Sequence, residues 1–251
     1  MRIWTTFAVA AMAGALSLSA ASAAEITVLA NQGALSAIKD LAAGFEQATG
    51  NKVNVNLKQG AALAKAVNTD EAADVVTNTI DQFDAMVKSG KVVSGSWVEF
   101  ARAGNGVAVK EGALKRDIST PEAFKQAMLN SRSIGHTNAG TGPFNTRLFM
   151  KLGIYDQVKG KVKIIMGKLV AAAVADGEVE IGIQQTNVIQ PYAGTQYLGP
   201  LPESLMEYGR IGVGVLTGSK HPEEARAFAK FMADPANADL LRKGFMEPPV
   251  R

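Results

Sequence analysis

The residues that could do chemistry in this chain are mostly neutral amides, hydroxyls and glycines that follow apolar, strand-like segments. Amide groups and free backbone N–H groups donate hydrogen bonds to anionic oxygen atoms, so the pattern favours binding of a small anion. None of the segments supplies a clear nucleophile or general base, and we predict no catalytic residue with them. The candidate ligand-binding residues at these segment ends are Asn31, Gln32, Gly33, Gln59, Gly60, Asn78, Thr141, Gly142, Gln184 and Gln185.

Each of these segments also has a simpler structural interpretation. Asn31 suits the cap of the helix that follows it. The stretch Gly140-Thr141-Gly142-Pro143 lacks the lysine of a phosphate-binding P-loop and could be a plain strand-to-helix turn. Two consecutive amides, Gln184 and Gln185, are hard to bury without partners at the end of an apolar strand, so we expect one of them to contact ligand.

Three further residues could contribute charge or proton transfer. Arg102 precedes the strand that should open the second lobe, where it is either a surface residue or a clamp for a carboxylate. Lys168 stands at a helix start, which is unfavourable for the helix dipole unless it meets an anion; it could equally be a surface lysine. We expect His136 to be a structural strand residue, although it is the best-placed neutral base if the protein is an enzyme.

The composition excludes several classes of function. The chain has 251 residues, no cysteine and only two histidines, His136 and His221, with a formal net charge of +3. Thiolate chemistry and disulfides are therefore absent, and zinc catalysis or a Ser-His triad is poorly supplied. Lysine and arginine are scattered rather than clustered, so we predict no nucleic-acid partner. We also predict no metal and no cofactor.

The elements that must position these residues alternate between strands and helices, which predicts mostly parallel sheets covered by helices. In such sheets ligands lie beyond the carboxyl ends of the strands. The predicted strands cover residues 25–30, 52–57, 74–77, 106–109, 133–136, 162–166, 180–183 and 209–217, and the predicted helices 34–48, 63–67, 80–88, 141–152, 169–176, 221–233 and 237–243, with one more beginning at Thr120-Pro121.

The first residues resemble a secretory signal peptide. A charged start, Met1-Arg2, precedes a short apolar run, and Ala21-Ser22-Ala23-Ala24 provides a cleavage site of small residues. The apolar core is shorter than the roughly 20 residues that span a bilayer, which argues against a membrane anchor. We therefore predict a signal peptide over residues 1–23 and a mature chain that works in the periplasm.

Segments along almost the whole mature chain resemble the molybdate-binding family of periplasmic solute-binding proteins, of the type II fold. No single segment is specific, and the resemblance lies in their order and spacing. They are Ile26-Thr27-Val28-Leu29-Ala30, Ala73-Asp74-Val75-Val76, Lys88-Ser89-Gly90-Lys91-Val92-Val93, Gly140-Thr141-Gly142 with Lys151-Leu152-Gly153-Ile154, and the run from Gly177 to Gln185.

This resemblance implies a two-lobed α/β fold, each lobe a mixed, mostly parallel sheet flanked by helices. Lobe 1 would comprise residues 24–100 plus 208–251, and lobe 2 residues 101–207. The implied function is the capture of a small anion, a molybdate-like oxyanion or a small organic carboxylate, between lobes that close about a hinge. The implied partner is the permease of an ABC-type importer, and we expect the chain to be a monomer.

The chain departs from this family at the site. Molybdate binders of the family typically use serines in the first two strand-end loops and a tyrosine in the late loop, where this chain has Asn31-Gln32-Gly33, Gln59-Gly60-Ala61 and Gln185. Backbone N–H groups could still hold an oxyanion, but amides and Arg102 suit an organic ligand better. A divergent branch of the family also resembles a periplasmic aconitate isomerase. An isomerase of a small tricarboxylate is therefore the alternative function.

Overall fold

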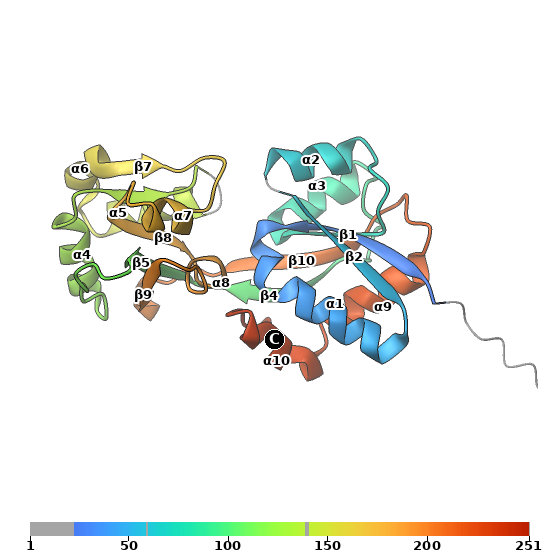
Figure 1. Ribbon diagram of the computed structural model, residues 1–251. Helices are drawn as coiled ribbons and strands as arrows, with labels where there is room; N and C mark the ends of the chain where they lie inside the picture. The colour runs from blue at the N-terminus through green and yellow to red at the C-terminus, as the bar shows by residue number, and fades with distance from the viewer. Residues whose placement is uncertain (1–22, 59, 139–140, 251) are drawn as a thin grey trace, which may run out of the picture.

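The computed structural model describes residues 23–58, 60–138 and 141–250. Nearly all of the predicted signal peptide and the candidate ligand residue Gln59 lie outside the described residues. The described chain forms two five-stranded sheets, each flanked by helices, which lie next to each other and are joined by extended segments (Figure 1). This arrangement confirms the predicted mixed α/β fold.

The first sheet has the strand order β2-β1-β3-β10-β4. β1 runs parallel to β2 and β3, whereas β10 runs antiparallel to β3 and β4. The carboxyl ends of β1 and β3 therefore lie side by side at one edge of the sheet. The strands are β1 (Glu25–Asn31), β2 (Lys52–Lys58), β3 (Val75–Thr79), β4 (Val98–Ala103) and β10 (Gly209–Val215).

Helices cover both faces of the first sheet. β1 alternates its side chains between them: Ile26 and Val28 pack with α1 and α9, whereas Leu29 packs with α2 and α3. α1 ends at Gly50, which adopts the left-handed conformation that favours glycine. The helices are α1 (Leu35–Thr49), α2 (Ala61–Asn68), α3 (Phe83–Lys88), α9 (Pro222–Met232) and α10 (Ala238–Lys243), with short 3-10 turns at Gln32–Ala34, Ile80–Gln82 and Pro235–Asn237.

The second sheet repeats this plan with the order β7-β6-β8-β5-β9. β6 runs parallel to β7 and β8, and β5 runs antiparallel to β8 and β9. The parallel pair again brings two carboxyl ends together, here at His136 and Gln185. The strands are β5 (Asn105–Lys110), β6 (Ile134–His136), β7 (Val162–Ile164), β8 (Ile181–Gln185) and β9 (Thr195–Pro200).

The helices of the second sheet also separate by face. Phe124, Phe149 and Val158 place α4, α5 and α6 on the large core, whereas Val174 of α7 and Ile189 of α8 belong to two smaller clusters. α4 begins as predicted, because Oγ1 of Thr120 accepts the Ala123 N–H and Pro121 occupies the first position. The helices are α4 (Pro121–Leu129), α5 (Thr141–Lys151), α6 (Tyr155–Val158), α7 (Val170–Ala175) and α8 (Thr186–Ile189), with 3-10 turns at Lys159–Lys161 and Glu203–Leu205.

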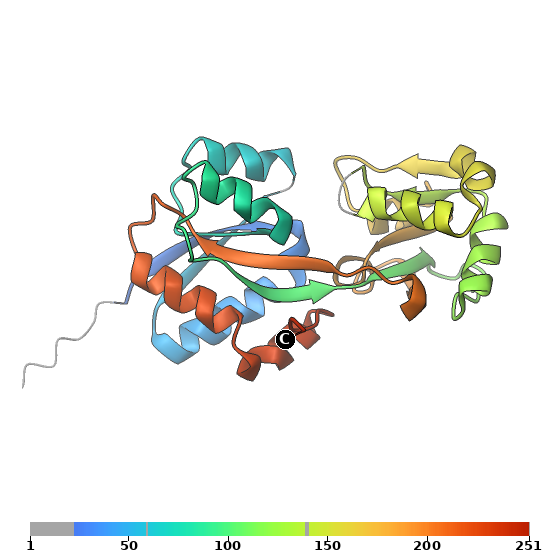
Figure 2. The same ribbon diagram turned by 180° about the vertical axis from the view of Figure 1, so that it is seen from behind.

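The chain passes between the two sheets twice. The first crossing is Gly104, between β4 and β5, and the second is residues 201–208, before β10 (Figure 2). We call the first sheet with its helices lobe 1, and the second sheet with its helices lobe 2. The predicted lobe boundaries near residues 100 and 207 stay a prediction. Within the described ranges, no helix is both long and apolar enough to cross a membrane.

Candidate functional site

The lobe 1 side of the candidate site is fixed where β1 and β3 end. The backbone N–H of Asn31 donates to Oγ1 of Thr77 over 3.0 Å, and that hydroxyl donates to Oδ1 of Asn31 over 2.9 Å. Thr77 is fully buried in the sheet, so it anchors the Asn31 amide at its oxygen. Nδ2 of Asn31 then lies 3.2 Å from the point where Gly33 would carry a Cβ. A donor is thereby held beyond the end of the strand.

The lobe 2 side is formed by the end of β8, where two successive glutamines make contacts with different lobes. Oε1 of Gln184 accepts the backbone N–H of Val170 over 3.1 Å, so this buried amide caps α7 inside lobe 2. Gln185 points to the other side, as alternation along a strand requires. A Cβ on Gly209 would lie 2.2 Å from Nε2 of Gln185, and one on Gly33 would lie 3.6 Å from Oε1. Gln185 therefore reaches across to lobe 1.

A direct hydrogen bond also joins the two lobes at this place. Nδ2 of Asn187, in α8, donates to the carbonyl oxygen of Gly33 over 2.8 Å. Asn187 is almost fully buried, so this bond is shielded from water. We call Asn31, Gly33, Gln185 and Asn187 the amide edge. Two of its residues belong to lobe 1 and two to lobe 2, and three of its side chains are carboxamides.

The start of α5 lies against the end of β6 in lobe 2. A Cβ on Gly142 would lie 1.8 Å from the carbonyl oxygen of Thr137, so only glycine allows this close approach. Thr141 is buried, with its hydroxyl 3.4 Å from that of Thr137. Nδ1 of the buried His136 lies 2.7 Å from the Thr137 carbonyl oxygen, which can only accept. Nδ1 therefore carries a proton and donates it in this contact.

The remaining neutral candidates are less closely engaged. Gln32 is half-buried in the turn between β1 and α1. Oδ1 of Asn78 accepts the N–H of Thr79 over 2.9 Å, which is a local turn contact. Gly60 begins α2, is exposed and has a φ of 44°. Their roles in ligand binding stay predictions.

Arg102 lies at the first crossing between the lobes, where it pairs with Glu247 and its buried Nε lacks a hydrogen-bond partner. Its Nη2 lies 2.5 Å from Oε2 of Glu247, and its guanidinium lies 4.2 Å from the centre of the Tyr208 ring. The backbones of Arg102 and Glu247 also exchange hydrogen bonds of 2.8 and 2.9 Å. The C-terminal segment is therefore tied to β4. The role of Arg102 in ligand binding stays a prediction.

Lys168 makes ion pairs within lobe 2. Its Nζ contacts the carboxylates of Glu178 and Asp176, the latter over 3.1 Å. The hydrogen bonds to Glu178 and then to Asp176 raise the pKa of Lys168. The unfavourable position at a helix start is thus balanced by two acidic side chains of the same lobe. The structure does not bring Lys168 into contact with the amide edge.

Three buried asparagines of lobe 2 have amide atoms without hydrogen-bond partners. Asn187 lacks a partner at Oδ1, as does Asn105 at the start of β5, which pairs with Gln185 across the sheet. Asn145, in α5 and fully buried, lacks partners at both Oδ1 and Nδ2. None of these three residues was among the candidate site residues. A polar residue between Phe144 and Leu148 on an apolar helix face was the available signal for Asn145.

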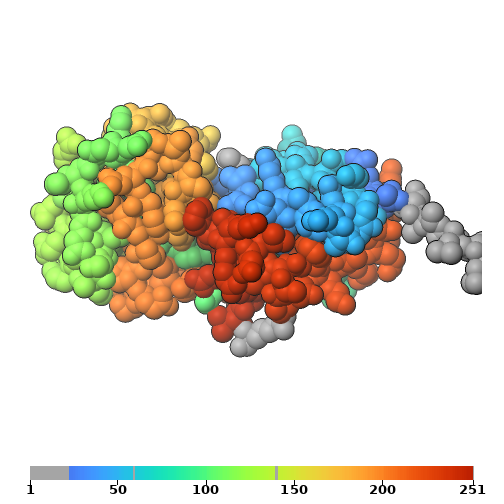
Figure 3. Space-filling view, turned by 60° about the horizontal axis from the view of Figure 1, so that its bottom comes forward, coloured from blue at the N-terminus to red at the C-terminus, as the bar shows by residue number. Residues whose placement is uncertain are grey.

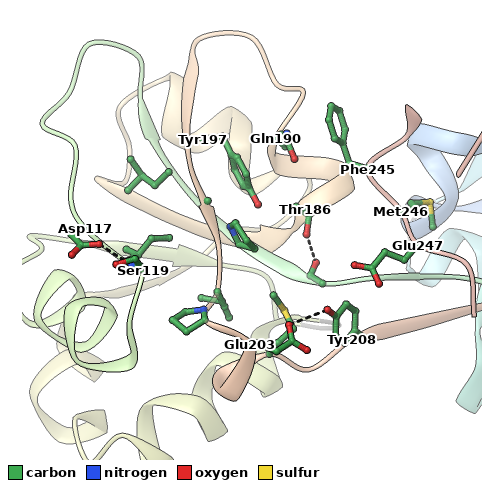
Figure 4. A pocket seen from close by; sticks show the side chains of 18 of the residues that line it. Asp117, Ser119, Thr186, Gln190, Tyr197, Glu203, Tyr208, Phe245, Met246 and Glu247 are labelled. Carbon is green, nitrogen blue, oxygen red and sulfur yellow. Dashed lines mark hydrogen bonds between the residues drawn. The ribbon is translucent and has the colours of Figure 1, made fainter. Parts of the chain in front are cut away.

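A groove of about 930 Å³ is bordered by α8, β9 and the C-terminal segment (Figure 4). Thr186 and Gln190 of α8 line it, with Tyr197 of β9 and the C-terminal residues Phe245 and Glu247. In the space-filling view the red C-terminal segment lies against the orange part of lobe 2 (Figure 3). Burial raises the pKa of Tyr197 to about 12, so its hydroxyl stays protonated.

The charges around this groove are largely paired with protein groups. Glu247 pairs with Arg102, Arg242 with Asp239, and Arg116 with Glu180. The groove residue Thr186 is next in the chain to Gln185 and Asn187 of the amide edge. In the part of the chain that the structure describes, no group of three or more histidine, aspartate or glutamate residues is arranged to hold a metal ion.

Two α/β lobes joined by two crossings, with polar strand ends meeting between them, define a solute-binding protein. The sequence profile of the bacterial extracellular solute-binding protein family matches residues 26–247. The chain belongs to this family, and the predicted resemblance to periplasmic solute-binding proteins is confirmed.

Individual relatives agree with this assignment. An aconitate isomerase from a Pseudomonas species is 28% identical over 237 residues, which is 92% of this chain and 90% of the relative. The periplasmic molybdate-binding protein of Azotobacter vinelandii has a TM-score of 0.73 at 16% identity, over 90% of this chain and 100% of that chain. PEB3 of Campylobacter jejuni, solved with L-phospholactate, has a TM-score of 0.70 at 16% identity, over 89% and 100%. At these identities the two structures show the fold alone.

Proposed function

We propose that this protein is exported to the periplasm, where it captures a small anion between its lobes and delivers it to the permease of an ABC-type importer. The observation that carries the proposal is the amide edge, where the amides of Asn31 and Gln185 approach the same glycine from opposite lobes. Export follows from the signal peptide expected over residues 1–23. The permease follows from the family. We expect the protein to be a monomer.

The amide edge can hold an anion with neutral donors. The amide of Asn31 and the backbone N–H groups at the start of α5 offer hydrogen bonds, and the dipole of this 11-residue helix favours negative charge at its start. The predicted cations Arg102 and Lys168 are already paired. Because a buried polar group left unpaired costs about 1–3 kcal/mol, an ill-fitting anion would lose affinity quickly.

A small organic carboxylate fits this edge better than a tetrahedral oxyanion. The strand-end loops carry amides where molybdate binders of this family typically carry serines. The aconitate isomerase relative is named for a tricarboxylate, and PEB3 was solved with a phosphorylated carboxylic acid. We therefore place a di- or tricarboxylate first among the ligands, with molybdate second.

An isomerase is the second candidate, and His136 is the observation that favours it. Because Nδ1 donates to the Thr137 carbonyl, Nε2 is the basic atom of a buried imidazole next to the start of α5. A neutral imidazole in this position could take a proton from a carbon acid held at the amide edge. The aconitate isomerase relative matches this chain over almost its full length, as such a role requires.

Thermal unfolding of the mature chain separates these possibilities. The panel is molybdate, tungstate, sulfate, cis-aconitate, trans-aconitate, citrate and succinate. A ligand at 100 times its dissociation constant stabilises a fold by about 2.7 kcal/mol, which shifts the midpoint measurably. The proposal predicts a shift with at least one carboxylate. A shift with molybdate or tungstate alone would contradict the carboxylate assignment, and no shift with any of the seven would contradict the proposed binding function.

The same samples distinguish carrier from enzyme. The absorbance of cis- and trans-aconitate is followed over time, with the His136→Gln variant as a matched control. Binding without interconversion supports transport. Interconversion that disappears in His136→Gln while binding remains would establish the isomerase instead.

A further inference from the structure

The geometry points to Gly209 as a positioning residue that keeps a notch open in lobe 1 for the Gln185 amide, and through it sets ligand affinity. This inference rests on the proposed function, because Gln185 is the lobe 2 amide of the site. Gly209 opens β10 at the second crossing and was not among the candidate residues. The notch is formed by Gly209 and Gly33, one at each end of the Gln185 carboxamide.

The space that Gly209 leaves is already filled by Gln185. A Cβ on Gly209 would lie 2.2 Å from Nε2 and 3.5 Å from Cδ of Gln185, whereas the nearest backbone atom, the Ala103 carbonyl oxygen, would lie 3.7 Å away. The φ of Gly209 is not in the left-handed region, so alanine is compatible with its backbone. A methyl group would therefore act on the Gln185 side chain and leave the strand intact.

Gly33 forms the second wall of the notch, at the place where Gln185 approaches Asn31. Around the point where Gly33 would carry a Cβ, Nδ2 of Asn31 lies at 3.2 Å and Oε1 of Gln185 at 3.6 Å. The notch thus holds amides from the two lobes close to one point. If the Gln185 amide were displaced from Gly209, this approach of the Asn31 amide donor and the Gln185 amide oxygen from opposite lobes would be lost, although each lobe would remain folded.

A double-mutant cycle tests the notch. Gly209→Ala, Gln185→Ala and the double variant are compared with the wild type, with trans-aconitate and molybdate as the two probes in calorimetric titration. We expect Gly209→Ala to weaken binding of trans-aconitate about tenfold in the wild type, and by less than about twofold when Gln185 is already alanine. Equal weakening in both backgrounds would overturn the inference, because Gly209 would then act without Gln185.

Thermal unfolding without ligand provides an independent readout. Gly209→Ala should lower the midpoint by about 3 °C in the wild type and have almost no effect beside Gln185→Ala. Additive midpoint shifts would overturn the inference that Gly209 acts through Gln185. Non-additive shifts in a chain that binds neither probe would support the notch and count against the proposed function.

Two further variants protect this test. In Gly218→Ala the new Cβ would have no atom within 4 Å, so this change should alter neither affinity nor midpoint. If Gly209→Ala alone does not fold, the Gly209→Ala/Gln185→Asn double variant shortens the amide by one methylene and should restore folding. Failure of Gln185→Asn to rescue Gly209→Ala would then contradict the notch.

Discussion

The two lobes present different edges to each other. In lobe 1 the Asn31 oxygen and the Thr77 hydroxyl satisfy one another at the end of β1. In lobe 2 Asn105, Asn145 and Asn187 hold buried amide atoms without partners in the same part of the lobe. This edge of lobe 1 is therefore organised by its own hydrogen bonds, whereas lobe 2 holds three buried asparagines with unpartnered amide atoms. Such groups in a folded protein are expected at functional sites.

Away from the edge, each lobe has one carboxylate that joins several segments. In lobe 1 Asp74 accepts hydrogen bonds from the backbone of Thr27, Lys220 and His221 and from the Ser219 hydroxyl. In lobe 2 Glu180 accepts from Arg116 and Arg132. Asp74 is more deeply buried and has uncharged donors, so lobe 1 depends more strongly on its one carboxylate.

Replacing Asp74 should have the largest effect on stability. Asp74→Asn removes the negative charge that four donors of two segments share, and we expect it to lower the free energy of unfolding by about 3 kcal/mol. Glu180→Gln should cost about 1 kcal/mol, because its arginine partners reach solvent. Urea unfolding measures both, with the exposed Asp70→Asn as control. An equal or larger effect at Glu180 would contradict the claim that lobe 1 depends more strongly on its carboxylate than lobe 2 does.

Replacing one buried polar residue in each lobe should change stability in opposite directions. Thr77→Val removes a satisfied hydroxyl and leaves the Asn31 oxygen unpaired, so we expect a loss of about 1–2 kcal/mol. Asn145→Leu removes two unpartnered atoms, and we expect a gain of about 1 kcal/mol. Chemical unfolding monitors both variants. A loss of stability in Asn145→Leu as large as that in Thr77→Val would contradict the difference between the edges.

Acid should weaken the lobes through the same two carboxylates. Burial tends to raise the pKa of Asp74 and of Glu180, but hydrogen bonds from Thr27 and Ser219, and from Arg116 and Arg132, hold both below their ordinary values of 3.8 and 4.5. A carboxylate with a lowered folded-state pKa stabilises the fold above its unfolded value, and this contribution is lost as the pH falls. Unfolding free energy should therefore drop below about pH 4.5, with a shallower drop in Asp74→Asn. If the variant and the wild type lost unfolding free energy identically as the pH falls, Asp74 would be excluded as a source of that loss.

The smallest effect is expected at Lys168. Its ion pairs with Glu178 and Asp176 lie at the surface of lobe 2, so Lys168→Ala should change the dissociation constant for a carboxylate by less than about twofold. A loss of tenfold or more in a calorimetric titration would show that Lys168 turns towards the ligand. The two lobes would then differ in the charge that they present to the ligand as well as in their hydrogen bonds.

The sequence predicted the strongly periodic elements well, together with the edge strands β2 and β7, but it did not reveal the other two edge strands. α1 was expected over residues 34–48 and spans Leu35–Thr49. β4 and β9 were missed, and both are edge strands. β4 contains Glu99 and Arg102, and β9 ends in Gly199 and Pro200, so neither has the apolar run that marks a buried strand.

The candidate site was predicted as a set of loops but not as a set of contacts. Gln184 and Gln185 are identical in type, and only the direction of each side chain shows that one caps α7 while the other reaches Gly209. Asn187 followed the same strand and was passed over, because its partner, the Gly33 carbonyl, lies 154 positions away in the chain. Contacts between lobes depend on how they are placed, which local patterns do not encode.

The most direct test of the account is a calorimetric titration of trans-aconitate into the wild type, Asn31→Ala, Gln185→Ala and Gln184→Ala. If a small carboxylate is held at the amide edge, the wild type binds it, and both Asn31→Ala and Gln185→Ala weaken binding at least about tenfold. Gln184→Ala should lower the unfolding midpoint with little change in affinity. Binding unaffected by Asn31→Ala and Gln185→Ala would show that the ligand is held elsewhere, and would contradict the central claim.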